Sequence, residues 1–528
     1  MKFVKWLMVS TMLLCCQALS AQQTEAGIEV SQGPVFKTKK RAIPTKFVGA
    51  DSSGFYVMYS RGKHGRGRDY LYKFGYDLKP VASINLRAKV GHVKVRTMDV
   101  KMFNGQLYHF SRVNYNNQKS YYVQRINKED LTLEKNKLLT TVSGSSLIQI
   151  WGSGSHLSLS PDSTLVSLAY TVPRHFRKKE TLVTHVYDKD MNELWTQTYD
   201  LPYRMDLLII EGFEIDNNGR AYILAREDFQ WIKTRRSDPP FRRFFMTLAQ
   251  DGVIEETGID REGRRIDELD LLKAPNGDMI FVGYYSDRRV RSQGIYYRRV
   301  DGETGEVLDS TFQDFGTKFY YQRRFGPKSR GEGKTRGHDF LYNLDLNESF
   351  FMPDGSLRLV YEESFTSGPI QGRSSPYEST FHAGDVLVVN MGPTGELNWA
   401  RKIPKRQKTF EDKGAYSSYA VMQRENELSL LFNDNATNVY YDGTGRVARM
   451  PKGYDTMMTL SEVSESGDLQ RSNLQTWEQL GLKIRPALGF QLQLGSNEVL
   501  LFGHKRMRKQ RFVKVKYRGG QPTVMGQQ

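Results

Sequence analysis

The sequence predicts an all-β fold, because one pattern recurs along its 528 residues. An alternating apolar run is followed by a tight polar turn and by a second alternating run. A period of two places one face of each strand in a core, and Gly, Asn or Asp suits hairpin turns that need positive φ. Long amphipathic helical stretches are missing, apart from a short turn near 477–480. The polar turns lie at 51–54, 104–105, 161–163, 216–219, 275–277, 353–355, 425–426 and 495–497.

A second hairpin follows most of the first ones, and the resulting four-stranded units return roughly every 50 to 80 residues. Four-stranded units repeated radially are the blades of a β-propeller. We therefore predict a single β-propeller of about eight four-stranded blades. The alternatives are seven blades, if the weak second unit is misread, and two stacked β-sandwiches. The blades are expected near 47–87, 98–142, 157–200, 211–260, 268–315, 345–404, 415–470 and 488–520.

The last unit is one strand short. After the hairpin at 488–502 the sequence offers one further strand, at 512–517, before a Gly-rich polar end. An N-terminal strand within 28–37 is expected to supply the missing outer strand. This strand would close the ring and cover an exposed sheet edge.

Residues 1–21 are predicted to be a signal peptide. Lys2 and Lys5 precede an apolar run from Trp6 to Cys16, and small residues follow at 18–21. We therefore expect the mature propeller to span 22–528 and to be exported, to the periplasm, the outer membrane or the medium. No second long apolar stretch occurs, so no transmembrane segment is expected in the mature chain.

Both cysteines, Cys15 and Cys16, lie inside the apolar run. Cleavage after Ala21 would leave no cysteine, which excludes disulfides, thiol nucleophiles and thiolate metal sites. A lipoprotein anchor is disfavoured, because the residue before either cysteine is Leu14 or Cys15 where a small residue is expected.

Some of the second hairpins resemble those of quinoprotein dehydrogenase propellers and of a related outer-membrane assembly propeller. Thr394-Gly395 followed by Trp399 matches their docking motif, and Trp195 holds the same tryptophan in weaker form. The turn at 160–163 looks more like the Tol-type periplasmic propellers. The resemblance implies a fold and a compartment but no chemistry. Quinone binding is not carried over, because two other Thr-Gly pairs lack the tryptophan and the mature chain has no vicinal cysteines.

No catalytic residue, metal site or cofactor is predicted. Zinc-helix and phosphate-loop motifs are absent from the sequence. Residues 152–156 lack the nucleophile-elbow spacing, and Asp188 to Asn192 begins like a calcium loop but continues with Glu193 where glycine is required. The alternative function is a carbohydrate-active enzyme, a hydrolase or lyase, whose acids meet near the central channel from different blades.

The distribution of Lys and Arg suggests a partner. The formal net charge is +17, and removing Lys2 and Lys5 lowers it to +15, which favours polyanions. In a propeller the turns inside hairpins lie on one face, here called the turn face. The links between hairpins and between blades lie on the other, the link face. The turns carry few cations besides Lys79, Lys128 and Lys189, whereas the links are crowded with them.

We therefore expect the link face to dock an acidic glycan, lipopolysaccharide or an acidic envelope protein. Arg forks suit carboxylate, sulfate and phosphate, and Tyr rings offer stacking surfaces. Export argues against nucleic acid, and solvated loop charge without a ligand is the competing explanation. The segments 143–156, 316–344 and 366–384 are the expected contact loops. The candidate ligand-binding residues are Arg235, Arg236, Tyr320, Tyr321, Arg323, Arg324, Lys334 and Arg336.

Overall fold

The computed structural model covers the chain from 22 to 517 with gaps. The described residues are 22–23, 27–39, 42–61, 68–87, 89–144, 154–172, 178–228, 241–259, 264–286, 293–316, 344–367, 380–410, 412, 414–443, 447–506 and 509–517. The predicted signal peptide, 1–21, lies outside them.

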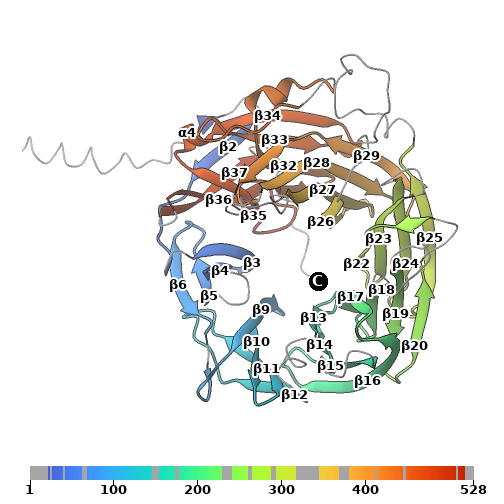
Figure 1. Cartoon of the computed structure of the whole chain (residues 1–528). Helices are drawn as coiled ribbons and strands as arrows, with labels where there is room; N and C mark the ends of the chain where they lie inside the picture. Colours follow the sequence, from blue (N-terminus) through green and yellow to red (C-terminus); the bar gives the residue numbers. More distant parts are fainter. Residues whose placement is uncertain are drawn as a thin grey trace, which may run out of the picture.

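Eight antiparallel sheets stand around a central channel (Figure 1), which confirms the predicted eight-bladed β-propeller. The strands of each blade are named from the innermost to the outermost. Blade 8 ends with two strands from the N-terminal part of the chain, β2 and β1. Blade 1 is β3 (Ile43–Asp51), β4 (Gly54–Arg61), β5 (Arg68–Phe74) and β6 (Pro80–Asn85); blade 2 is β9 (Arg96–Phe103), β10 (Gln106–Tyr115), β11 (Gln118–Ile126) and β12 (Lys137–Ser143); blade 3 is β13 (Ser155–Leu159), β14 (Val166–Thr171), β15 (Lys179–Tyr187) and β16 (Glu193–Arg204); blade 4 is β17 (Leu208–Ile215), β18 (Ala221–Asp228), β19 (Phe241–Leu248) and β20 (Ile254–Gly258). Blade 5 is β22 (Asp270–Lys273), β23 (Met279–Ser286), β24 (Gly294–Val300) and β25 (Val307–Asp314), with β21 (Arg265–Ile266) beside β23; blade 6 is β26 (Leu344–Phe351), β27 (Leu357–Ser367), β28 (Thr380–Met391) and β29 (Leu397–Ile403), with β30 (Gln407–Phe410) beside β28; blade 7 is β31 (Tyr419–Arg424), β32 (Glu427–Asp434), β33 (Met457–Val463) and β34 (Leu469–Thr476); blade 8 is β35 (Lys483–Phe490), β36 (Glu498–Arg506), β37 (Lys509–Tyr517), β2 (Ile28–Gln32) and β1 (Gln22–Gln23).

This strand order fixes which connections share a face. Each blade is an antiparallel sheet, and its main strands follow one another in chain order, except that the N-terminal β2 and β1 complete blade 8. The turns from first to second and from third to fourth strand therefore lie at one end of the blade. The connections from second to third strand, and from one blade to the next, lie at the other end. The turn face and the link face are thus real features of the molecule.

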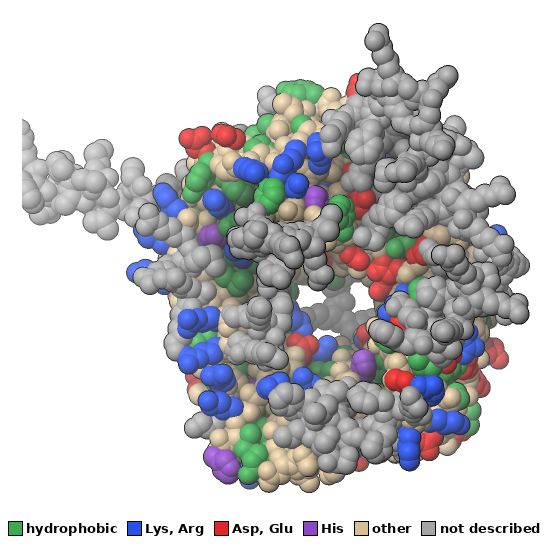
Figure 2. Space-filling view, in the orientation of Figure 1, with side chains coloured by type: hydrophobic (Ala, Val, Ile, Leu, Met, Phe, Trp, Pro, Cys, Tyr) green, Lys and Arg blue, Asp and Glu red, His purple; other side chains and the backbone are tan. Residues whose placement is uncertain are grey.

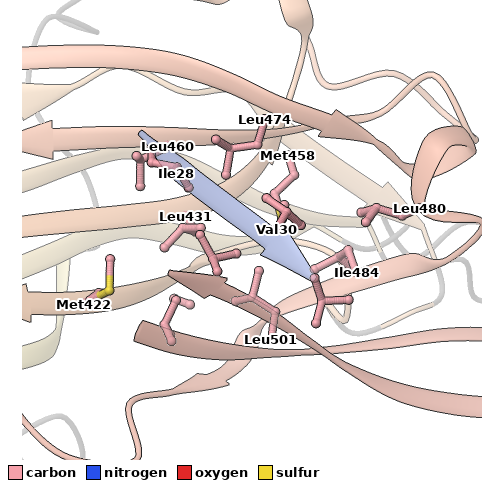
Figure 3. Close-up of a cluster of buried hydrophobic side chains, with 14 of the residues drawn as sticks. Ile28, Val30, Met422, Leu431, Met458, Leu460, Leu474, Leu480, Ile484 and Leu501 are labelled. Carbon is pink, nitrogen blue, oxygen red and sulfur yellow. The ribbon is translucent and has the colours of Figure 1, made fainter. Parts of the chain in front are cut away.

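The N-terminal strand β2 closes the ring, as predicted. It pairs antiparallel with β37, from Ile28 opposite Tyr517 to Gln32 opposite Val513. Ile28 and Val30 are buried among side chains of blades 7 and 8 (Figure 3). The first and last segments of the chain thus build one sheet.

Hydrophobic packing joins every blade to its neighbours. Eight clusters of buried side chains occur among the described residues, and each draws on two adjacent blades. The cluster between blades 8 and 1, for example, packs Phe512 against Phe55 and Phe74. A ring of such interfaces excludes two separate sandwiches.

The two tryptophans of the motif that resembles the quinoprotein propellers make contacts between neighbouring blades. Trp399 of blade 6 donates a hydrogen bond from Nε1 to the carbonyl oxygen of Glu465 in blade 7, at 2.9 Å. Gly467 lies under its ring with φ of +84°, and a Cβ there would come within 2.7 Å of the indole. Trp195 of blade 3 also lies against blade 4, where a Cβ on Gly219 would come within 3.4 Å of the indole. The motif therefore holds neighbouring blades together.

Blade 6 departs from the predicted pattern. Strand β28 runs for 12 residues and pairs with β29 only from Val386 onward. Its first residues, Thr380 to Ala383, pair instead with β30, which lies in the link to blade 7. Elsewhere α4 (Trp477–Leu480) confirms the short helical turn expected near 477–480. Within the described ranges, no helix has the length and apolar character needed to cross a membrane.

Candidate binding face

The predicted ligand-binding residues cannot be placed. Arg235 and Arg236 fall within 229–240, and the other six fall within 317–343, outside the described residues. The three predicted contact loops are described only at their ends. These ends are 143–144 and 154–156 of the first loop, 316 and 344 of the second, and 366–367 and 380–384 of the third. Other residues of the link face lie within the described ranges.

The exceptional cations of the turn face are neutralised by nearby acids. Lys79 pairs with Asp77 at 3.1 Å, and Lys189 pairs with Asp190 at 2.6 Å. Lys128 of blade 2 pairs with Asp51 of blade 1 at 2.9 Å. Burial would raise the pKa of Asp51, but hydrogen bonds from Ser53 and Lys128 outweigh it and lower that pKa. Little net charge is left at these turns.

The link face brings like charges together. Arg61 and Arg68 are direct cross-strand partners at the end of β4 and β5, and neither forms an ion pair with a described carboxylate. Like charges directly opposite in a sheet are destabilising. Blade 1 therefore keeps a charge arrangement that folding alone does not favour.

A three-stranded extension of blade 6 on the link face carries exposed aromatic rings. Phe365 of β27 is opposite His382 of β28, which is opposite Lys408 of β30. Direct partners point to the same side of a sheet, as do residues two apart. Phe410 therefore shares this side, and we call Phe365, His382, Lys408 and Phe410 the aromatic platform. The Phe365 and His382 rings stack, with centroids 4.3 Å apart and planes at 9°. Phe365 and Phe410 are each 40% exposed.

Three cations surround the ring of Phe410. The ammonium groups of Lys408 and Lys452 lie 5.3 and 4.5 Å from the ring centroid, and the Arg449 guanidinium carbon lies at 5.6 Å. Arg449 also donates to the Lys408 carbonyl oxygen at 3.1 Å. None of the three forms an ion pair with a described carboxylate. Figure 2 shows Lys and Arg side chains gathered near β28, β32 and β33. An anion is the partner that such a cluster lacks.

His382 adds a titratable group to the platform. Partial burial lowers its pKa, and the charges of Lys408 and Arg449 lower it further. The ring is therefore largely neutral at pH 7 and serves as an aromatic surface. Its Nε2 lies 3.0 Å from the Ser367 hydroxyl.

Two cavities adjoin the platform. One, of about 270 Å³, is lined by Phe365, His382 and Lys408 together with residues 405–407. A second, of about 530 Å³, shares Asp385 with the first and is lined also by Arg401, Arg471 and Asp442. The two cavities are therefore neighbours, and side chains of both charges line the second.

The central channel carries a separate group of acids. Burial raises the pKa of Glu268 to about 8, and the neighbouring charges of Asp270 and Asp345 contribute. The pKa of Asp270 rises to about 6, again chiefly because of burial. Glu211 is paired with Arg243 at 2.8 Å. Figure 2 shows acidic side chains beside the channel opening. Glu211, Asp270 and Asp345 lie in β17, β22 and β26, so these acids come from three neighbouring blades.

No metal centre is evident in the part of the chain that the structure describes. No group of three or more His, Cys, Asp or Glu side chains there is arranged to hold a metal ion.

Sequence reasoning missed the platform. His382 falls inside the predicted loop 366–384, but Lys408, Phe410, Arg449 and Lys452 were not among the candidates. Two local signals were present, namely an aromatic residue two positions after a lysine in a link, and basic residues on both sides of Pro451. Neither signal shows that the two links meet.

The comparisons with known proteins assign this chain to no family. No protein-family model matches the sequence, and no curated protein matches it either. Among solved structures, an oligogalacturonate lyase in complex with manganese is 10% identical, with 95% of this chain and 96% of that chain covered and a TM-score of 0.36. An ulvan lyase of polysaccharide lyase family PL25 is 12% identical, with 55% and 82% covered and a TM-score of 0.31. A protein of unknown function from Bacteroides caccae is 10% identical, with 66% and 94% covered and a TM-score of 0.29. We draw no functional conclusion from similarities this low.

Proposed function

We propose that this chain is an exported binding or scaffold propeller whose link face docks a polyanion. The ligand would be an acidic glycan, lipopolysaccharide or an acidic envelope protein. The observation that carries the proposal is the contrast between the faces. Lys79, Lys128 and Lys189 on the turn face each form an ion pair with an acid, whereas Lys408, Arg449 and Lys452 on the link face pair with no carboxylate that the structure describes.

The positive charges of neighbouring side chains on the link face act together on an approaching anion. Cations that lie together without counter-ions sum their fields and raise the local concentration of anions. The opposed Arg61 and Arg68 add to this field at a cost in stability. A bound polyanion would supply the missing negative charge and offset that cost. Export rests on the sequence of residues 1–21, and the compartment is part of the proposal.

Matched double variants test the proposal. Lys408→Ala with Lys452→Ala removes two unpaired cations, and Lys79→Ala with Lys189→Ala removes two paired ones from the turn face. On a heparin column the first double variant should elute at clearly lower salt than the unmodified mature chain. The turn-face variant should elute close to it. Equal shifts for the two variants would refute a link-face site.

A second experiment tests whether the predicted contact loop 316–344 takes part in binding. Replacing Arg323, Arg324, Lys334 and Arg336 by Ala should also weaken retention, and unchanged retention would exclude that loop from the contact.

A second candidate is a carbohydrate-active enzyme that works in the channel. The observation favouring it is the pair Glu268 and Asp270, whose raised pKa values of about 8 and 6 suit a proton donor and acceptor near neutral pH. Tyr361 is fully buried, and its hydroxyl has no hydrogen-bond partner among the described residues. Burial raises the pKa of Tyr361, and the charges of Asp270 and Glu268 raise it further. Turnover of an oligosaccharide that survived Glu268→Gln unchanged would contradict this candidate.

A further inference from the structure

We propose that the aromatic platform is a subsite for an acidic polysaccharide, which places sugar rings on Phe410 and on the Phe365–His382 stack. This inference rests on the proposed function and narrows its ligand to one chemical class. The acidic substituents of the sugars would face Lys408, Arg449 and Lys452.

The platform is held by regular structure. Phe365, His382 and Lys408 form one row across three paired strands, and Ser367, Thr380 and Phe410 form the next. Strands in a sheet lie about 4.8 Å apart, so the register fixes the distances between these side chains. Arg449 is fixed in turn by its hydrogen bond to the Lys408 carbonyl oxygen. A rigid platform loses little entropy when it binds.

The composition of the two rows fits a sugar acid. Aromatic rings stack against flat, partly apolar rings, and Phe365 and Phe410 each expose 40% of their surface. Ser367 and Thr380 add hydroxyls in the same row as Phe410. The ammonium groups of Lys408 and Lys452 lie over the Phe410 ring, 5.3 and 4.5 Å from its centroid, and place positive charge next to the exposed ring surface. Rings, hydroxyls and carboxylates or sulfates occur together in an acidic polysaccharide.

Other polyanions fit only part of this arrangement. An acidic peptide such as polyglutamate brings carboxylates but no ring to stack. A nucleic acid brings rings and phosphates, and its bases could stack on the aromatic side chains. Base stacking would make no use of the Ser367 and Thr380 hydroxyls. The two adjoining cavities, of about 270 and 530 Å³, leave room for a chain to continue beyond the platform.

The test uses Phe410→Ala in the full mature chain. Its matched control is Tyr440→Ala, because Tyr440 is 87% exposed in a link of blade 7 and has no place on the platform. Titration calorimetry at constant ionic strength would compare an oligogalacturonate, a heparin oligosaccharide, a polyglutamate of equal charge and an oligothymidylate. Phe410→Ala should lower affinity for at least one of the two acidic sugars about tenfold. It should change polyglutamate affinity by less than about twofold, and Phe410→Trp should restore sugar binding.

Each contrary result has a distinct meaning. Equal loss for sugar and polyglutamate would show that the ring plays no part, which overturns the subsite while polyanion docking stands. Loss limited to oligothymidylate would assign the platform to nucleic acid and overturn it as well. Failure of all four probes to bind at low salt would overturn both the subsite and the proposed function.

Discussion

The surroundings of Glu268 in the folded propeller change the pKa of its carboxyl strongly. Its carboxyl lies near Asp270 of the same blade and Asp345 of the next blade, and burial together with these charges raises its pKa to about 8. The ordinary value is 4.5. The folded chain thus holds this proton more tightly than the unfolded chain does. Stability from this group is complete below pH 4.5 and is lost as the pH rises toward 8.

Glu268→Gln should remove that part of the pH dependence, because the amide keeps the shape without titrating. We expect the melting temperature of the variant to fall less than that of the unmodified chain between pH 5 and pH 8. Thermal unfolding followed by circular dichroism measures it, with the exposed Glu255→Gln as control. Parallel curves for the unmodified chain and Glu268→Gln would contradict the assignment.

At this scale the sequence predicts types of residue but not their partners. The exceptional cations Lys79, Lys128 and Lys189 could be identified from the hairpin pattern. The pairing of Lys128 with Asp51 crosses two blades and leaves no local signal. Phe365, His382 and Lys408 likewise come from three strands. Their shared face depends on the register of β28 with β30.

Strand β2 is the element on which ring closure depends. Its residues were predictable because the last unit lacked an outer strand and the N-terminal segment alternated suitably. The structure pairs it with β37 and buries Ile28 and Val30 between blades 7 and 8 (Figure 3). Strand β30 was not predictable in the same way. It has four residues, and it pairs only because β28 extends beyond β29.

Val30→Asp should destabilise the propeller by about 3 kcal/mol or more, because it buries an unpaired carboxylate at the closing strand. Val35→Asp makes the same change at a position that is 45% exposed and should cost little. Urea unfolding of both variants gives the two free energies. Similar losses would show that β2 does not secure the ring.

The whole molecule is a closed ring in which eight hydrophobic interfaces join adjacent blades. The closed ring is the feature that the repeat pattern predicted best. Two hairpins per unit, in constant order, were enough to indicate radial closure and the division into two faces. Ligand identity could not follow from the repeats, because a site on the rim combines links that are far apart in the chain. Arg449 and Lys452 meet Phe410 only because blades 6 and 7 are neighbours.

The salt dependence of heparin affinity tests the electrostatic account of the link face most directly. If the cations of the link face provide the attraction, the affinity of the protein for heparin should fall at least about tenfold between 50 and 200 mM salt. The slope should be shallower after Lys408→Ala with Lys452→Ala, and unchanged after Lys79→Ala with Lys189→Ala. Affinity that stays constant across the series, or equal slopes for both double variants, would contradict the account.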